Sequence, residues 1–334
     1  MVVAFKKILS VALRIVVSIV LLVLLFRLNK IDVSNLIFDI KGADKALLAA
    51  GFMVFFLVYL LGFWRWYMLL RAAGIQAPLK RLIVSFSGGV FFSIFLPSTI
   101  GGDIVKTADL AGHTRKTKEV IATVLLDRLS GYTGLVLVIL PALLLGREMV
   151  QDKVVLSSVA VIVILLVGIL LVLFNSFIYS RITKFLTAPG AGKIKEALSD
   201  LHSEIHIFRH HKKVIVYNLI LSFFIQLIAP LSAYLIALSL GIKIKFLYFL
   251  VFLPIIGAIT LLPIAIGGLG LRENLFVVYF AKVGVVKQLA VAMSLLSFSF
   301  VVIYGAVGGI IYVLTVHHRR LQHNQPSQLH KANP

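Results

Sequence analysis

Six apolar stretches, each long enough to cross a bilayer as a helix, constrain what this chain can fold into. The hydrocarbon core of a membrane is about 30 Å thick, which about 20 helical residues span. Backbone polar groups in that core have no water to bind, and a helix satisfies them within one segment. We therefore predict an all-α polytopic membrane protein, whose full-length spans are residues 8–28, 47–70, 119–145, 154–180, 213–240 and 288–316.

Two further apolar segments, 82–100 and 246–268, carry the same short phrase. Residues 96–106 read LPSTIGGDIVK and residues 262–272 read LPIAIGGLGLR, so the matched positions keep one offset without a gap. Each copy interrupts an apolar segment with proline and paired glycines, which break helices. Interrupted segments at matching places in two halves indicate a transporter site. The predicted break positions are Pro97, Gly101, Gly102, Pro263, Gly267, Gly268 and Gly270.

The basic loops predict the topology. Lys and Arg gather in loops 71–81, 106–118 and 181–213 and near both ends of the chain, and they favour the cytoplasmic side. All share that side if segment 82–100 enters the membrane and returns, and segment 246–268 then enters from the opposite face. We therefore predict inverted-topology repeats with two re-entrant segments and both termini in the cytoplasm. If both segments crossed fully, two basic loops would move outside, which the charge pattern disfavours.

One membrane domain is expected over residues 1–316, with repeat halves at about 47–145 and 213–316. Between the halves, residues 193–209 alternate apolar and charged positions at helical spacing. This pattern predicts an amphipathic helix on the cytoplasmic side, which either packs under the bundle or contacts lipid. Residues 317–334 form a polar tail, which we expect to be disordered.

The charge and the cysteine content of the chain limit the classes of partner that it can bind. The formal charge is +20, but the cations flank membrane segments, where they orient the protein and meet anionic lipid headgroups. We therefore expect membrane lipids as partners and no nucleic acid. The chain has no cysteine, and its histidine pairs form no metal-ligand constellation, so neither a metal nor a cofactor is expected.

Asp127 and Arg128 lie inside the apolar span 119–145. A charged residue at the centre of a membrane helix is costly, so it faces a cavity or a partner. Neighbours in a helix point about 100° apart, so each of the two needs a partner on another element. Arg65 is one candidate partner for Asp127. The pair either lines a polar site or belongs to a structural ion-pair network that locks helices together.

Charged residues also follow each break. Asp103 and Lys106 follow the first, and Arg272 and Glu273 follow the second. A helix that starts after paired glycines presents free N–H groups, which attract an anion such as phosphate. Lys106 or Arg272 would add a full positive charge there. The alternative is that the glycines allow tight packing at a re-entrant tip while the cations reach the membrane interface.

These residues resemble the flippase-like membrane family related to the lysylphosphatidylglycerol synthase transmembrane region. The similar pieces are Leu96-Pro97 with Gly101-Gly102-Asp103, Leu126-Asp127-Arg128-x-x-Gly131, and Leu262-Pro263 with Gly267-Gly268-Leu269-Gly270-Leu271-Arg272-Glu273. The resemblance covers about residues 8–316. In bifunctional members such a module precedes a soluble aminoacyltransferase domain and moves the modified lipid between leaflets. Other relatives are tied to polyprenol-linked sugars or hopanoids. The resemblance therefore implies lipid translocation without synthesis.

The expected function is a non-enzymatic lipid flippase of the inner membrane that works by alternating access. Its substrate would be an anionic phospholipid or a polyprenyl-linked or headgroup-modified lipid, with a separate lipid-modifying enzyme as a further partner. The two tips would meet near the midplane, and the predicted substrate-binding residues are Asp103, Lys106, Asp127, Arg128, Arg272 and Glu273. Three alternatives remain: an ion- or proton-coupled transporter of a small solute, a membrane-embedded transferase, and a non-transporting organiser of lipid synthesis.

Overall fold

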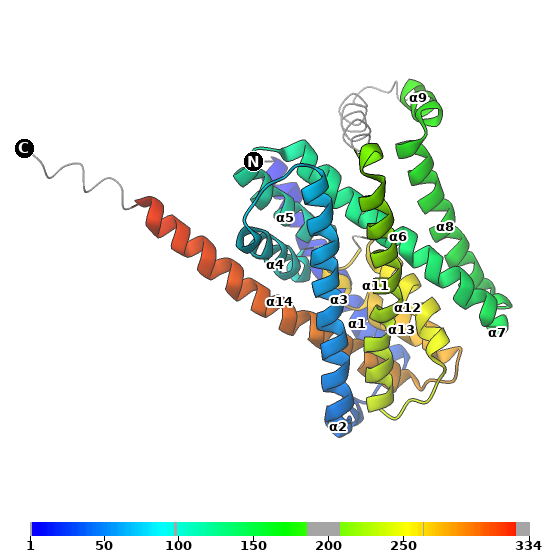
Figure 1. Cartoon of the computed structure of the whole chain (residues 1–334). Helices are drawn as coiled ribbons and strands as arrows, with labels where there is room; N and C mark the ends of the chain where they lie inside the picture. Colours follow the sequence, from blue (N-terminus) through cyan, green and yellow to red (C-terminus); the bar gives the residue numbers. More distant parts are fainter. Residues whose placement is uncertain (1, 97–98, 186–207, 263, 325–334) are drawn as a thin grey trace, which may run out of the picture.

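A computed structural model describes residues 2–96, 99–185, 208–262 and 264–324 of the chain. This part is helical and contains no strand (Figure 1). The all-α prediction is therefore confirmed. The elements are α1 Val2–Leu28, α2 Val33–Gly42, α3 Lys45–Ala72, α4 Leu79–Phe95, α5 Thr99–Thr114, α6 Thr117–Leu145, α7 Arg147–Val150, α8 Lys153–Phe174, α9 Ser176–Phe185, η1 Phe208–His211, α11 Lys212–Ser239, α12 Phe246–Thr260, η2 Ile266–Gly268, α13 Leu271–Ala281 and α14 Lys287–Asn324.

Five helices of the described part are long and apolar enough to cross a membrane: α3, α6, α8, α11 and α14. Each matches one of the predicted spans. The sixth predicted span lies within α1, which is helical, although its side chains are described only from residue 13 onward. The chain is therefore an integral membrane protein of the polytopic α-helical class.

Each of the two interrupted segments forms a helical hairpin. Helices α4 and α5 flank the first break, and α12 and α13 flank the second. At 1.5 Å per residue these four helices are about 17–26 Å long, which is less than the hydrocarbon thickness. The prediction of two broken segments is confirmed.

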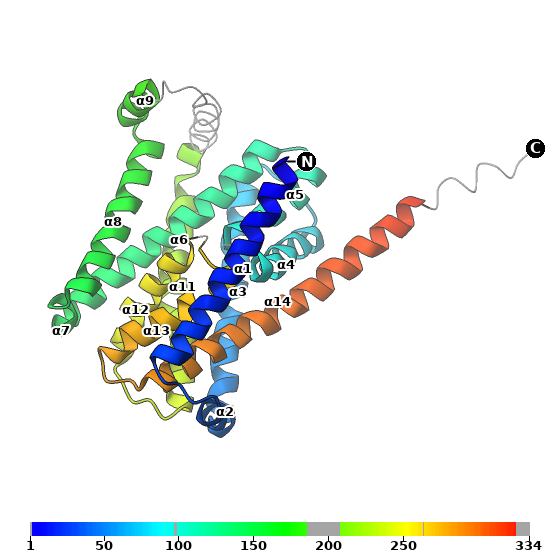
Figure 2. The same cartoon turned by 180° about the vertical axis from the view of Figure 1, so that it is seen from behind.

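The two hairpins enter the bundle from opposite ends. In Figures 1 and 2, α4 and α5 join the rest of the chain at the upper end, where α1 starts and α14 finishes. Helices α12 and α13 join it at the lower end, beside α2 and α7. Helix α6 also starts at the upper end, so the basic segment 106–118, which leads into it, lies there as well. This is the arrangement that the basic loops predicted.

Small residues let the first hairpin pack closely. A methyl group on Gly102 of α5 would overlap the carbonyl oxygen of Gly89 in α4 and lie 2.8 Å from Cβ of Ser93. Helix α14 crosses α4 in the same way, because a methyl group on Gly308 would lie 2.9 Å from the carbonyl oxygen of Ser87. Gly305 and Gly309, which form a GxxxG motif, also face α4. Such stripes hold membrane helices together where no hydrophobic force between them exists.

Two boundaries differ from the sequence prediction. Helix α8 ends at Phe174, because the side chain of Asn175 caps the next helix, α9, through the N–H groups of Phe177 and Ile178. Helix α14 continues to Asn324, so the first part of the predicted tail, from 317, is helical. The amphipathic helix predicted at 193–209 lies mostly outside the described residues.

Candidate functional site

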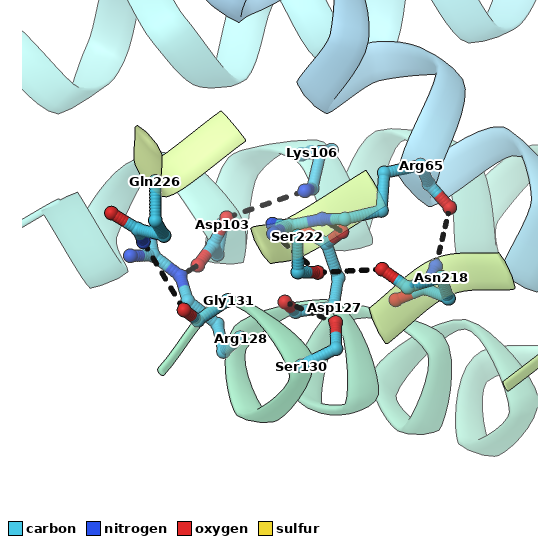
Figure 3. A network of polar contacts seen from close by, with 10 residues as sticks. All are labelled: Arg65, Asp103, Lys106, Asp127, Arg128, Ser130, Gly131, Asn218, Ser222 and Gln226. Atoms are coloured by element: carbon cyan, nitrogen blue, oxygen red, sulfur yellow. Dashed lines mark hydrogen bonds and ion pairs between the residues drawn. The ribbon is translucent and has the colours of Figure 1, made fainter. Parts of the chain in front are cut away.

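Two partly buried ion pairs join α6 to its neighbours (Figure 3). Nε of Arg65 in α3 donates to Oδ1 of Asp127 at 2.8 Å, and Nε of Arg128 donates to Oδ2 of Asp103 in α5 at 2.6 Å. Adjacent positions in a helix face different directions, so the two charges of α6 reach two different helices. Asp127 and Arg128 therefore have partners on other elements, as predicted, and the expected pairing of Arg65 with Asp127 is confirmed.

Arg65 connects three helices. Its Nη1 donates to Oγ of Ser222 in α11 at 3.1 Å, and its backbone carbonyl accepts a hydrogen bond from Nδ2 of Asn218 at 3.0 Å. Gly131 makes room for the guanidinium group, since a methyl group there would lie 3.1 Å from Nη1 of Arg65. With its side chain 11% exposed, Arg65 is a clamp between α3, α6 and α11.

Lys106 lies beside the Asp103–Arg128 pair. Its Nζ is 3.4 Å from Oδ1 of Asp103 and 4.4 Å from the ring centre of Trp66 in α3. The residue is only 4% exposed. Asp103 therefore serves two cations at once, and the aromatic ring supplies further stabilisation of the ammonium group. The alternative that Lys106 reaches the membrane interface is excluded by this burial.

The second break holds Arg272 by a different arrangement. Glu273 is fully buried and caps the start of α13, where its Oε2 accepts from the N–H of Gly270 at 2.6 Å. Its Oε1 accepts from Nη2 of Arg272 at 2.5 Å, and Nε of Arg272 donates to Ser294 in α14 at 3.1 Å. The guanidinium group also stacks 4.3 Å from the ring centre of Phe298. Glu273 therefore positions Arg272.

The tips of the two hairpins meet. Gly267 adopts φ 56° and Gly270 adopts φ 80°, a left-handed backbone that glycine tolerates best. A methyl group on Gly267 would lie 2.9 Å from the carbonyl oxygen of Ile94, near the end of α4. The N–H of Ile266 donates to Oγ of Ser18 in α1 at 3.0 Å. The second copy of the repeated phrase thus packs against the end of α4, two residues before the first copy begins.

Arg128 borders two cavities. The larger has a volume of about 470 Å³ and is bordered by helices from both halves of the chain, with Arg128 and Arg272 as its charged residues and Tyr132, Gln226 and Phe276 among its other lining residues. The smaller, of about 290 Å³, is lined by Arg65, Asp103, Lys106, Asp127 and Arg128. Arg128 borders both cavities.

The structure groups most of the predicted site residues. Asp103, Lys106, Asp127 and Arg128 form one cluster, and Arg272 joins it through the larger cavity. Glu273 lines neither cavity among the described residues. Of the break positions, Gly101 packs on Leu96 and Gly102 on α4, whereas Pro97 and Pro263 lie outside the described residues.

Sequence reasoning missed Asn218 and Ser222 on the polar face of α11. Asn218 and Ser222 bind Arg65, and Gln226 donates to the carbonyl oxygen of Gly131 at 3.1 Å. The three side chains are spaced four residues apart in an apolar span, so they share one helix face. That periodicity is the signal which would have identified them.

The fold and the site define a class: a polytopic α-helical membrane protein with charged groups around two cavities, each of which is bordered by one of two broken helices. The family model described as "Lysylphosphatidylglycerol synthase TM region" matches residues 11–309, and the chain belongs to this family. It is 24% identical over 276 residues to a UPF0104 membrane protein of Methanothermobacter thermautotrophicus, covering 76% of this chain and 81% of that protein. It is 26% identical over 279 residues to a UPF0104 membrane protein of Pyrococcus horikoshii, covering 76% and 82%. No solved structure matches the chain.

Proposed function

We propose that the protein moves a lipid with a phosphate-containing headgroup between the leaflets of the cytoplasmic membrane. One observation carries the proposal: Arg128 and Arg272, from different halves of the chain, line the same cavity inside an apolar helical bundle. Charged side chains inside a membrane protein are rare because burying them is costly, and substrate pathways are among the functions that they mark. Arginine is the residue best suited to grip phosphate, since its planar group donates two parallel hydrogen bonds.

The walls of the larger cavity suit a lipid. Besides the two arginines, they consist mainly of apolar side chains from α3, α6, α11, α12, α13 and α14, such as Phe55, Leu253 and Val301. An amphiphile satisfies both parts of such a cavity, with its phosphate on the guanidinium groups and its apolar part along the walls. The family description, which concerns the membrane region of a lipid-modifying enzyme, supports a lipid-related role.

Movement of the two hairpins against each other would provide alternating access. Gly267 lies against Ile94, and Ser93, the neighbour of Ile94, lines the smaller cavity, so a displacement of the hairpins there would change the shape of that cavity. With both termini cytoplasmic, the first hairpin faces the cytoplasm and the second faces outward. The proposal assigns no chemical reaction to the chain, and a separate enzyme would supply any modified lipid.

Reconstitution tests this function. Liposomes containing the purified protein and a phospholipid labelled on an acyl chain report translocation when a membrane-impermeant reductant quenches label in the outer leaflet only. Each of the variants Arg272→Gln and Arg128→Gln should slow lipid exchange between the leaflets by about tenfold or more. The reason is that each variant loses a charged hydrogen-bond partner of the phosphate. The matched control is Lys243→Gln, since Lys243 is an exposed cation in the loop before α12. Unchanged exchange by both folded arginine variants would refute the site.

A further inference from the structure

The charged groups around the two cavities do not balance. We count the described charged residues that line either cavity, together with Glu273, the ion-pair partner of Arg272. This set contains four cations and three carboxylates. The cations are Arg65, Lys106, Arg128 and Arg272, and the carboxylates are Asp103, Asp127 and Glu273. The cluster therefore carries one excess positive charge when all groups are ionised.

The excess charge belongs to the Asp103 group. Asp127 is matched by Arg65 and Glu273 by Arg272, at 2.8 Å and 2.5 Å. Asp103 alone stands opposite two cations, and it lies closer to Arg128, at 2.6 Å, than to Lys106, at 3.4 Å. A buried cation that shares its carboxylate is poorly compensated, and such a charge favours the arrival of an anion.

The carboxylates are placed so that they cannot receive a positively charged ligand in the larger cavity. No Asp or Glu is among the described residues that line it. Glu273 is fully buried behind Arg272, and both of its oxygens already accept hydrogen bonds, from Gly270, Arg272 and Ser294. A ligand in this cavity therefore meets guanidinium groups and aromatic rings, with the acids turned away from it.

We infer that the site selects lipids whose headgroup is net negative and discriminates against lipids that carry added ammonium groups. One phosphodiester charge would neutralise the cluster. A zwitterionic headgroup would leave the excess charge in place, and an aminoacylated headgroup would bring further positive charge next to two arginines without a carboxylate to receive it. This inference rests on the proposed function. By this inference, the lysylphosphatidylglycerol in the family's description is a poor substrate for this chain.

The decisive measurement compares three lipids on the wild-type protein. Liposomes carry, at trace level and with the same acyl-chain label, phosphatidylglycerol, phosphatidylcholine or lysyl-phosphatidylglycerol. We expect phosphatidylglycerol to exchange about tenfold faster than the other two, because each like-charge or uncompensated contact costs at least one factor of ten. Equal rates for all three, or fastest exchange of the lysyl lipid, would overturn the inference while leaving translocation itself intact. No exchange of any lipid would instead refute the proposed function and the inference with it.

A variant that removes the charge of Lys106 tests whether this residue causes the preference for phosphatidylglycerol. Lys106→Met keeps an unbranched side chain against Trp66 but removes the excess charge, so we expect phosphatidylglycerol to lose most of its advantage over phosphatidylcholine. The control Lys243→Met removes an exposed cation that lines neither cavity, so this variant should keep the wild-type preference. A full preference in folded Lys106→Met would contradict the assignment of the excess charge. The wild-type comparison decides the inference even if this variant does not fold.

Discussion

Asp103 and Arg128 are joined by a hydrogen bond of 2.6 Å between Oδ2 and Nε. The bond connects α5, which begins at the first break of the chain, to the centre of the long helix α6. Arg128 also borders both cavities, so the pair couples the first hairpin to the larger cavity that the second hairpin lines. Any displacement of the first hairpin acts on a cavity-lining arginine through this contact.

The Arg65–Asp127 pair leads to a prediction about stability. Asp127→Leu leaves a buried guanidinium group without its carboxylate, which we expect to destabilise the protein by about 3 kcal/mol. The double variant Arg65→Met with Asp127→Leu replaces the whole pair by apolar groups and should be more stable than either single variant. Thermal unfolding in detergent micelles measures the cycle, and additive losses would show that the two residues do not act as a pair.

The contact between the hairpin tips can be tested with two glycines that both have a positive φ. Gly267 and Gly284 have φ values of 56° and 82°, so alanine strains both positions by about 1–2 kcal/mol. Only Gly267 faces an obstacle, the carbonyl oxygen of Ile94, whereas nothing lies within 4 Å of a methyl group on Gly284. We expect Gly267→Ala to lower the melting temperature and the lipid exchange rate more than Gly284→Ala. Equal effects would argue against a tight contact between the tips.

Packing of the first hairpin gives a second matched comparison. Gly102→Ala should push α5 away from α4 and destabilise the protein by about 1–3 kcal/mol, the usual range for overpacking. Gly112 lies on the same helix with open space around it, so Gly112→Ala should be neutral or stabilising by up to about 1 kcal/mol. If the hairpin is packed as described, Gly102→Ala lowers the melting temperature relative to wild type, whereas Gly112→Ala leaves it unchanged or raises it.

A pH effect is expected at the lower end of the molecule. Lys282 donates to Asp152 at 2.5 Å and holds the pKa of that carboxyl below its ordinary value. The pair therefore contributes stability above the ordinary aspartate pKa of about 3.9, and this contribution is lost as the pH falls through the lower pKa of the folded protein. The difference in melting temperature between wild type and Asp152→Asn should shrink on acidification. Lys282→Met removes the largest cause of the lowered pKa, so in that background the pH dependence should become weaker, while the N–H groups of Val154 and Val155 still act on the carboxyl.

The helices were predictable because the bilayer imposes a strong rule on short stretches of chain. An apolar run of about 20 residues has one low-energy structure in a membrane, and the span that became α6 shows it. Proline and paired glycine mark a break for equally local reasons, as at Gly267 with its left-handed backbone. Where a boundary was wrong, at Asn175, a single side-chain cap decided it.

The partners of the charged residues were harder to predict. A buried charge needs a counter-charge, so the need of Asp127 and Arg128 for partners follows from residue type alone. The identity of those partners depends on how helices pack, because Arg128 finds Asp103 at a separation of 25 residues and Arg65 finds Asp127 and Ser222 at 62 and 157. Glu273 shows the same limit, since its position after a break suited a ligand site equally well, while packing buried it behind Arg272.

Residue order and hydropathy are thus enough to establish a helical membrane protein with two broken segments, because bilayer energetics act on each segment separately. Which charged residues form ion pairs and which line a cavity depends on how the helices pack in the assembled bundle. Three acids became partners of cations, and two arginines came to line one cavity, because counter-charges and close helix contacts are supplied by segments that are distant in the chain.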